Sequence, residues 1–218
     1  MGKYESFNQN KFSVHQKIVR LVDQNKRVLD VGCSVGTISK NMKMNGCEVT
    51  GIELDEISAR KAKDYCKDVL VGDIESIELD NEYENYFDFI VFADVLEHLR
   101  NPGNVLRRFK KYLKDDGYLI ISLPNVANWK MRINLLFGNF DYKDHGLLDE
   151  GHIRFFNVKN AKNLVEDAGY EIVNFDITVG DINHFAQFFY KIGKLCPNLL
   201  AFQFLVVAKK EDNFRKNW

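Results

Sequence analysis

A glycine turn directly after an apolar segment is the first place where this sequence could do chemistry. Residues 27–36 read Arg-Val-Leu-Asp-Val-Gly-Cys-Ser-Val-Gly, so an apolar strand carries Asp30 at its end and enters a turn with Gly32 and Gly36. Glycines let the backbone approach a ligand closely and adopt dihedral angles that a Cβ forbids. Residues 35–44 are predicted to form a helix, whose unpaired first amides point at whatever fills the turn. The pattern predicts a loop that binds a nucleotide-type cofactor.

The glycine spacing separates two classes of cofactor. A dinucleotide fingerprint needs glycine at the first, third and sixth places, which here are Gly32, Ser34 and Thr37. Two of these three positions fail, so a nicotinamide or flavin dinucleotide is disfavoured. A strand with two glycines also fits an ordinary tight turn of any α/β domain, and the rest of the chain must decide between these readings.

Acidic residues follow the next two predicted strands. Glu53 ends the β-rich segment 48–53, about twenty residues beyond the glycine loop, where a cofactor ribose is held in such folds. A carboxylate at this place can accept hydrogen bonds from both ribose hydroxyls. Asp73 lies near the end of the predicted strand 69–74. We expect Asp73 to face an adenine amino group, with Ile74 against the ring.

A group of possible metal ligands follows the most apolar segment of the chain. Residues 87–92 form a nearly continuous apolar run, which predicts a central parallel strand buried on both faces. Asp94, Glu97 and His98 come directly after it. Spacings of three and four predict that these side chains share one face of a helix.

Alternation of strands and helices positions these residues. We predict helices over 9–23, 56–67, 102–114 and 158–168, and further strands over 118–123, 170–178 and 202–208, with a turn at 115–117. Repeated alternation predicts an α/β fold with a doubly wound sheet in one domain, residues 1–218. Within it, residues 1–25 are expected to form an N-terminal helical cap.

Two segments depart from this alternation. Residues 125–156 mix aromatic, amide and charged side chains, with helical character only around 129–137. Because long irregular insertions in compact domains are usually functional, we predict a substrate lid here. Residues 181–198 are rich in aromatic side chains and are predicted to be a helical insertion that covers the sheet and a substrate pocket.

Composition limits the partners and the compartment. The 218 residues include 30 basic and 31 acidic side chains, so no broad positive surface is expected; a DNA partner is excluded and RNA is disfavoured. The four scattered cysteines fit a reducing, cytoplasmic location. The longest apolar run, 199–208, is interrupted by Gln203 and is too short for a stable membrane anchor. We expect a monomer or a homodimer.

The order and spacing of these motifs resemble class I S-adenosylmethionine-dependent methyltransferases. The shared features are the glycine loop, Glu53, residues 72–74, residues 94–99 and the turn at Gly117, with Ser34 in place of the usual middle glycine. The resemblance covers essentially the whole chain and implies a Rossmann-like seven-stranded sheet of order 3-2-1-4-5-7-6, with the last strand antiparallel. It implies S-adenosylmethionine as the cofactor, leaving as S-adenosylhomocysteine, with Asp30 organising the loop and the methionine end. The residues expected to bind it are Asp30, Gly32, Cys33, Ser34, Gly36, Glu53, Leu54, Asp73, Ile74, Ala93 and Asp94.

Three shorter segments, 123–125, 151–156 and 197–203, resemble a narrower group of small bacterial methyltransferases. Members of that group often accompany glycan or cell-surface biosynthesis. We therefore expect O-methylation of a small-molecule or sugar-containing acceptor.

Such a reaction needs a group that removes the acceptor's proton, because the sulfonium already activates the methyl group. His152 is the first candidate base, since an imidazole titrates near neutral pH and the residue lies between the lid and a helix. His145 is the second. Arg154 could hold an acidic group of the acceptor. The alternatives are a structural hydrogen bond for His152 and an ordinary salt bridge from Arg154 to Asp149 or Glu150.

Two other functions stay open. Asp94, Glu97, His98 and His152 resemble the metal site of small-RNA terminal-ribose methyltransferases and of some ubiquinone-pathway O-methyltransferases. A magnesium-like ion there could orient two vicinal hydroxyls of a ribose or catechol and lower the pKa of one. The same hexapeptide, residues 94–99, also occurs widely in methyltransferases without a known metal, so a divalent metal is not favoured. The other alternative is a non-catalytic binding module, which the retained cofactor loop argues against.

Overall fold

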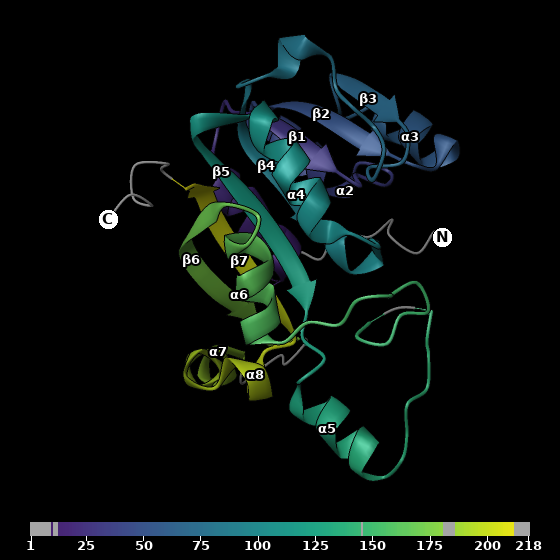
Figure 1. Cartoon of the computed structure of the whole chain (residues 1–218), viewed down its shortest axis with the longest axis vertical. Coiled ribbons are helices and arrows are strands. Elements are labelled where there is room, and N and C mark those ends of the chain that lie inside the picture. Colours follow the sequence, from purple (N-terminus) through teal and green to yellow (C-terminus); the bar gives the residue numbers. More distant parts are fainter. Residues whose placement is uncertain (1–9, 11–12, 145, 181–185, 212–218) are drawn as a thin grey trace.

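The computed structural model describes residues 10, 13–144, 146–180 and 186–211; the predicted base candidate His145 lies outside them. A mixed sheet of seven strands, in the order β3-β2-β1-β4-β5-β7-β6, runs through the molecule (Figure 1). The strands are β1 Arg27–Val31, β2 Glu48–Glu53, β3 Asp68–Val71, β4 Phe87–Ala93, β5 Leu113–Pro124, β6 Tyr170–Thr178 and β7 Gln203–Lys210. The first five strands pair in parallel, whereas β7 is antiparallel to both β5 and β6. The predicted fold class and strand order are confirmed.

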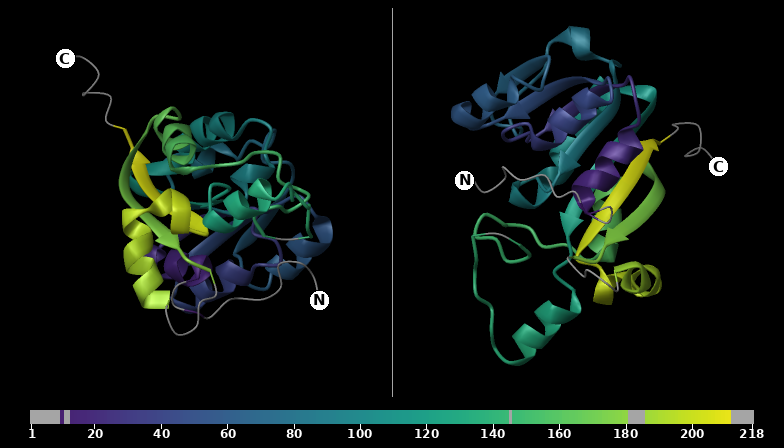
Figure 2. Two further views of the ribbon diagram at one scale, coloured as in Figure 1. Left: turned by 90° about the horizontal axis from the view of Figure 1, so that it is seen from below. Right: turned by 180° about the vertical axis from the view of Figure 1, so that it is seen from behind.

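Helices cover both faces of the sheet (Figure 2). The helices α1 Val14–Val22, α2 Thr37–Met44 and α3 Glu56–Ala62 supply one layer, and α4 Pro102–Phe109 and α6 Val158–Glu166 supply the other. Each of the two layers closes its own apolar core against the sheet. The predicted helices 9–23, 56–67 and 102–114 are thus shorter in the structure, the last because Lys110–Tyr112 forms a separate 3-10 turn, η3.

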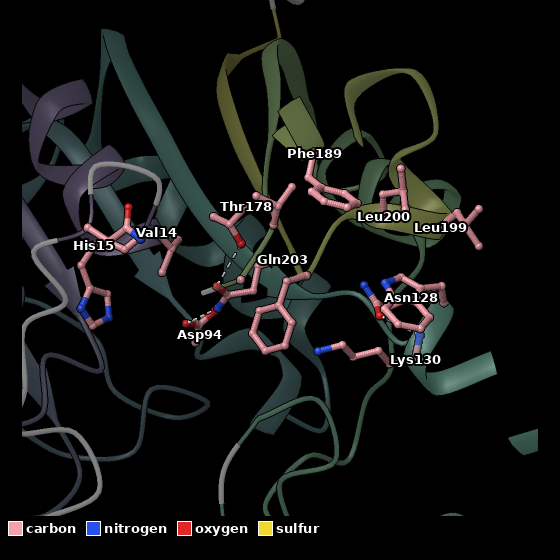
Figure 3. A pocket seen from close by; sticks show the side chains of 16 residues that line it. Val14, His15, Asp94, Asn128, Lys130, Thr178, Phe189, Leu199, Leu200 and Gln203 are labelled. Atoms are coloured by element: carbon pink, nitrogen blue, oxygen red, sulfur yellow. Dashed lines mark hydrogen bonds between the residues drawn. The ribbon is translucent and has the colours of Figure 1, made fainter. Parts of the chain in front are cut away.

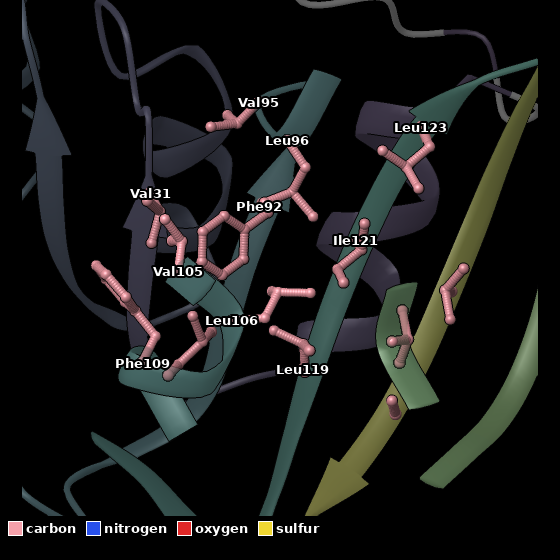
Figure 4. Packing of buried hydrophobic residues seen from close by; sticks show 14 of the residues in the cluster. Val31, Phe92, Val95, Leu96, Val105, Leu106, Phe109, Leu119, Ile121 and Leu123 are labelled. Carbon is pink, nitrogen blue, oxygen red and sulfur yellow. The ribbon is translucent and has the colours of Figure 1, made fainter. Parts of the chain in front are cut away.

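The central strand β4 shows why the sequence is apolar over 87–92. Successive side chains of a strand point to opposite faces. Ile90 and Phe92 enter the core beneath α4, while Val91 enters the core beneath α1 and α2, and all three are fully buried. Figure 4 shows Phe92 among the side chains of the first of these cores. A strand segment that is covered on both faces favours apolar side chains. The polar residue of β4, Asp88, lies near the start of the strand, is only partly buried, and accepts hydrogen bonds from the Arg27 amide and from Lys114.

The predicted turn at residues 115–117 is wrong, because β5 already begins at Leu113 and continues through these residues. Its pairing with β4 shifts between Phe87 and Phe89, so Leu113 lies opposite Phe87 and Tyr118 lies opposite Phe89. The extra residues of β5 form an irregularity of the β-bulge type. A Cβ at Gly117 would lie 2.8 Å from Leu113 Cδ1 and 3.0 Å from the carbonyl oxygen of Asp88. The glycine therefore allows close packing within the sheet rather than a turn.

The insertion after β5 extends beyond the carboxyl ends of the parallel strands (Figure 1). Its helix α5, Trp129–Leu136, buries only Met131 among its side chains, and a long connection then leads to α6. The helices α7 Ala186–Leu195 and α8 Pro197–Leu200 lie near the same end of β6 and β7. Two further 3-10 turns are η1 Asn81–Tyr83 and η2 Leu96–His98. Among the described residues, no helix has the length and apolar character needed to cross a membrane.

Replacing Phe92 with alanine tests the core beneath α4. Phe92 is fully buried, and its ring packs edge to face on Phe109 with centroids 5.7 Å apart. We expect Phe92→Ala to lower the free energy of unfolding by about 3–5 kcal/mol, because it removes buried area and leaves a cavity. Urea denaturation measures the change. Leu136→Ala, at a side chain that is 80% exposed, is the control and should change it by less than about 0.5 kcal/mol.

Candidate active site

A cavity of about 600 Å³ lies at the carboxyl ends of β1, β2 and β4, where ligands of open α/β sheets bind. Ten of the eleven residues predicted to bind a cofactor line it: Asp30, Gly32, Cys33, Ser34, Glu53, Leu54, Asp73, Ile74, Ala93 and Asp94. Gly36 does not line it. Gly36 instead starts α2 with a φ of 79°, and a Cβ there would lie 3.0 Å from the Tyr65 ring. We call this space the cofactor cavity.

The glycine turn has the close approach that its sequence predicts. Gly32 has a φ of +72°, and a Cβ on it would lie 2.6 Å from Cγ2 of Val95. The amides of Gly32 and Cys33 both donate to the carbonyl oxygen of Ile52, at 2.8 and 3.0 Å. The turn is therefore fixed to the end of β2 and leaves no space for a side chain at Gly32.

Ser34 occupies the place of the missing middle glycine and takes a left-handed conformation, with a φ of 50°. Its amide donates to Oε2 of Glu53 at 2.8 Å, while Oε1 of Glu53 accepts from the amides of Leu54 and Asp55, at 2.9 and 3.0 Å. The Glu53 carboxylate thus joins the glycine turn to the start of the next segment. A hydrogen bond to a charged acceptor compensates the strain of a non-glycine residue with positive φ.

Asp30 is a buried carboxyl at the end of β1, with an exposed fraction of 2%. Burial raises its pKa to about 6, although the hydroxyl of Ser39, which donates to Asp30 Oδ2 at 2.5 Å, opposes the shift. Ser39 comes from α2, so this hydrogen bond fixes the helix against the strand end. The sequence did not single out Ser39 because a serine inside an amphipathic helix carries no distinct signal.

A second and larger cavity, of about 1050 Å³, adjoins the first. It lies among α1, α5, α7, α8 and the adjacent ends of β6 and β7 (Figure 3). Its apolar lining is Val14, Trp129, Val179, Phe189, Leu199, Leu200 and Phe202, and its polar lining includes His15, Asp94, Asn128, Lys130, Thr178 and Gln203. We call it the acceptor cavity. The predicted lid and the predicted aromatic insertion both contribute to its wall.

Asp94 and His15 line both cavities, so they mark the place where the two spaces meet. Asp94 directly follows β4 and has a φ of 55°. The Ser122 hydroxyl donates to Asp94 Oδ1 at 2.7 Å and accepts from the Asp94 amide at 2.9 Å. Gln203 Nε2 donates to Asp94 Oδ2 at 2.8 Å, as Figure 3 shows. Burial raises the pKa of Asp94, and these donors and His15 oppose the shift. One donor on each oxygen therefore holds the carboxylate in one orientation.

A third group, which we call the Glu97 cluster, consists of Glu97, His98 and His152. One side-chain nitrogen or oxygen from each residue lies within 4.8 Å of the others. Nε2 of His152 is 3.7 Å from Oε1 of Glu97, and the two imidazole rings pack edge to face with centroids 4.8 Å apart. The expectation that Asp94 shares a helical face with Glu97 and His98 is wrong, because η2 begins only at Leu96 and Asp94 has the positive φ that ends the strand.

The Glu97 carboxyl is 1% exposed, and neither of its oxygens has a hydrogen-bond partner among the residues that the structure describes. Burial raises its pKa well above the usual value, and the nearby acids Asp94 and Asp149 add to the shift. Burial, with His98 beside it, lowers the pKa of His152. Both groups are therefore neutral under conditions where each would otherwise carry charge.

Two of the predicted catalytic residues, His152 and Arg154, do not line the acceptor cavity, and the third, His145, lies outside the described residues. His152 lines neither cavity: its Nδ1 lies 3.3 Å from the carbonyl oxygen of Leu147, and its Nε2 faces Glu97. Arg154 donates to the carbonyl oxygen of Arg100 and lines a separate surface cavity with Arg107. The sequence did not identify His15, Lys130, Thr178 or Gln203. Only Gln203 carried a signal, since it interrupts an apolar strand.

Asp30→Asn tests how the buried carboxyl group of Asp30 affects the stability of the folded protein at different pH values. The pKa of Asp30 in the folded protein, about 6, lies above the ordinary value of 3.8, so the folded state binds the proton more tightly and loses stability as pH rises between these values. Above this window the ionised carboxylate costs about 3 kcal/mol. Urea denaturation should therefore show Asp30→Asn gaining up to about 3 kcal/mol relative to the wild type at pH 8, and much less at pH 4.5. A difference independent of pH would contradict this account, and Asp116→Asn serves as the exposed control.

Comparisons with known proteins agree with this architecture. The family model of the methyltransferase domain matches residues 4–174. Two curated relatives are ubiquinone biosynthesis O-methyltransferases, from Marinobacter nauticus (33% identical over 110 residues, 46% of this chain and 44% of the relative) and Dechloromonas aromatica (35% over 110 residues, 46% and 45%). The matched part spans a little under half the length of these relatives.

Solved structures share the fold over nearly the whole chain. A TehB-like S-adenosylmethionine-dependent methyltransferase from Corynebacterium glutamicum has a TM-score of 0.60 at 18% identity and covers 90% of this chain and 86% of its own. A possible histamine N-methyltransferase from Thermotoga maritima has a TM-score of 0.65 at 17% identity, with 92% and 89% covered. With the cofactor cavity and the strand order, these findings confirm the class predicted from the motifs: the chain belongs to the methyltransferase-domain family and has the class I fold of S-adenosylmethionine-dependent methyltransferases.

Proposed function

We propose that the protein transfers a methyl group from S-adenosylmethionine to an oxygen of a small-molecule acceptor bound in the acceptor cavity. The observation that carries this proposal is that the cofactor cavity and the acceptor cavity meet at Asp94 and His15. A methyl donor and a nucleophile can react only when they are held in contact and in line. The names of the curated relatives, O-methyltransferases, support oxygen as the methylated atom.

The donor would lie along the carboxyl ends of the strands. Glu53 would hold the ribose hydroxyls with the acceptor capacity that its backbone donors leave free. Asp73, whose Oδ1 accepts the amide of Glu75 at 2.8 Å, would offer its other oxygen to the adenine amino group, with Ile74 against the ring. Asp30 lies next to the glycine turn, and its carboxylate would attract the ammonium of the methionine end.

When bound, S-adenosylmethionine supplies an electrophilic methyl group on a positively charged sulfur. The protein's own residues have three tasks in the transfer: they align the acceptor oxygen, exclude water and receive the acceptor's proton. The apolar wall of the acceptor cavity serves the second task. Asp94, held by Ser122 and Gln203, places a fixed negative charge beside the sulfonium position.

The lining of the acceptor cavity favours an acceptor with a flat apolar body and a few polar groups. Trp129, Phe189 and Phe202 supply apolar and aromatic surface, while Asn128 can pair with hydroxyls. Lys130 is the cation of this lining and would hold an anionic substituent. Amide and lysine side chains also bind sugar hydroxyls, so this lining is compatible with a sugar-containing acceptor as well. That acceptor stays a prediction.

Loss of cofactor binding in Glu53→Ala, Asp73→Ala tests this proposal. Each substitution removes a charged acceptor, which is worth about 1.5–3 kcal/mol, so the affinity for S-adenosylhomocysteine should fall by about a hundredfold or more. Isothermal titration calorimetry measures it, and urea denaturation confirms that the variant is folded. Glu48→Ala is the matched control, because Glu48 lies at the opposite end of β2 and bonds Lys67 and Tyr86 instead. Unchanged affinity in the double variant would exclude this cavity as the cofactor site.

A metal-assisted version of the reaction is favoured by the Glu97 cluster. A fully buried carboxylate without a hydrogen-bond partner beside two imidazoles fits a divalent cation, because an ion would supply the missing interaction. Glu97, His98 and His152 would hold the ion, and His98 also lines the cofactor cavity. The chemistry supplied there would be orientation of vicinal hydroxyls and a lower pKa for one of them.

Titration with Mn²⁺ alone, followed by electron paramagnetic resonance, tests the metal site without an acceptor. We expect the wild type to bind Mn²⁺ and Glu97→Gln to bind it about tenfold more weakly or worse, since a ligand charge is lost. Glu166→Gln, at an exposed acid of α6, should bind Mn²⁺ as the wild type does. Absence of Mn²⁺ binding in the wild type would leave Glu97 as a neutral buried acid and remove the metal-assisted alternative.

A further inference from the structure

We infer that His15, on the first turn of α1, is the general base that takes the proton of the acceptor hydroxyl. The inference rests on the proposed function and replaces His152 in that role. His15 and Asp94 are the two residues that line both the cofactor cavity and the acceptor cavity, whereas His152 lines neither. A general base must lie within hydrogen-bond reach of the proton that it removes. Its position relative to the two substrates is therefore the first criterion for assigning the base.

The helix that carries His15 is held firmly. Ser13 caps α1 by accepting the amide of Gln16 at 3.3 Å. Two residues after His15, Lys17 donates to Asp176 Oδ2 at 2.6 Å and to the carbonyl oxygen of Ile177 at 2.7 Å, which joins α1 to β6. Catalytic side chains on such anchored elements keep a productive orientation. Figure 3 shows the His15 imidazole and the Asp94 carboxylate on the same side of the acceptor cavity.

The surroundings of His15 favour a neutral imidazole before the proton transfer. Burial lowers its pKa, and the carboxylate of Asp94 opposes this shift. The positive end of the α1 dipole also disfavours a cation in the first turn. Among the described residues, the other ionisable groups that line the two cavities are Lys130 on the acceptor side and Asp30, Cys33, Glu53, Asp55, Asp73, Glu75 and His98 on the cofactor side. A neutral imidazole can accept a proton, and Asp94 then stabilises the imidazolium that forms.

Asp94 itself is less suited to the role of base. Both of its oxygens already accept hydrogen bonds, Oδ1 from Ser122 and Oδ2 from Gln203. Donors that stabilise a carboxylate lower its readiness to take a proton. Asp94 is therefore a positioning residue, and the ring of His15 is the group that receives the proton.

The methyl transfer is a nucleophilic substitution at the methyl carbon. A lone pair of the hydroxyl oxygen forms the new bond to the methyl carbon, the carbon–sulfur bond breaks, and its electrons stay on sulfur, so S-adenosylhomocysteine leaves neutral. The hydroxyl proton moves to a ring nitrogen of His15, and the O–H electrons stay on the ether oxygen. After the product leaves, the imidazolium returns its proton to water.

The charge of the sulfonium gives a test that needs no acceptor. S-adenosylmethionine carries a positive sulfur, while S-adenosylhomocysteine is neutral there and otherwise alike. If His15 faces the methyl position, saturation with S-adenosylmethionine should raise the acid dissociation constant of His15 about threefold or more above its value with S-adenosylhomocysteine. Proton–carbon NMR titration of the histidine rings measures it, with His15→Gln to assign the signal.

The outcomes are distinct. Equal dissociation constants of His15 with both compounds, each shown by calorimetry to bind, would place His15 too far from the methyl group and overturn the inference while leaving the proposed function intact. Failure of both compounds to bind would overturn the proposed function and this inference with it.

A kinetic experiment tests the same inference with 3,4-dihydroxybenzoate as the acceptor. Its flat ring carries vicinal hydroxyls, and its carboxylate can pair with Lys130. His15→Gln should lower kcat about a hundredfold or more with little change in affinity for S-adenosylhomocysteine, and the acidic limb of the kcat/KM profile should disappear. A wild-type kcat and profile in His15→Gln would overturn the inference. If the wild type forms no product from this probe, the NMR titration decides alone.

Discussion

The arrangement of this protein depends on the way Asp94 is held at the end of β4. Its carboxylate accepts hydrogen bonds from Ser122 on β5 and Gln203 on β7, so three neighbouring strands meet at one side chain. The antiparallel insertion of β7 beside β5 is what brings Gln203 to this position, because residue 203 starts the strand opposite Pro124. Both cavities take their common boundary from this point. A shift in the register of β7 by one residue would turn Gln203 to the other face of the sheet and release Asp94.

Local spacing was enough to predict which residues line the cofactor cavity. The glycine turn, Glu53 and Asp73 each follow a strand within a few residues, so a strand–turn–helix pattern places them at the same edge of the sheet. Ser34, the departure from the usual pattern, is explained by its hydrogen bond to Glu53. For the wall of the acceptor cavity, the sequence predicted two segments, the lid and the aromatic insertion, but not the individual residues that line the cavity. His15, Thr178 and Gln203 come from distant parts of the chain, and their meeting depends on tertiary packing that no local pattern carries.

The incorrect prediction for residues 94–98 has a physical cause. A spacing of three and four indicates one helical face only where a helix is present. Here the chain leaves β4 through a left-handed residue, Asp94, before a single 3-10 turn begins, so Asp94 points to the cavities and Glu97 points into the interior. His152, the first candidate base, lies away from both cavities for a related reason. A histidine between a lid and a helix can face either the cavity or the core, and its neighbours in space, Glu97 and Leu147, decide which.

Part of the acceptor wall lies far from the glycine turn along the chain. The glycine turn, Glu53 and Asp73 come from the first third of the chain, whereas Phe189, Leu200 and Gln203 lie after residue 174, where the match to the family model ends. The acceptor wall can therefore diversify by substitution near the carboxyl end while the donor pocket stays constant. Substitutions in α7, α8 and the start of β7 would thus alter one part of the acceptor wall without touching the glycine turn, provided that Gln203 remains to hold Asp94, while α1 and α5 supply the rest of that wall.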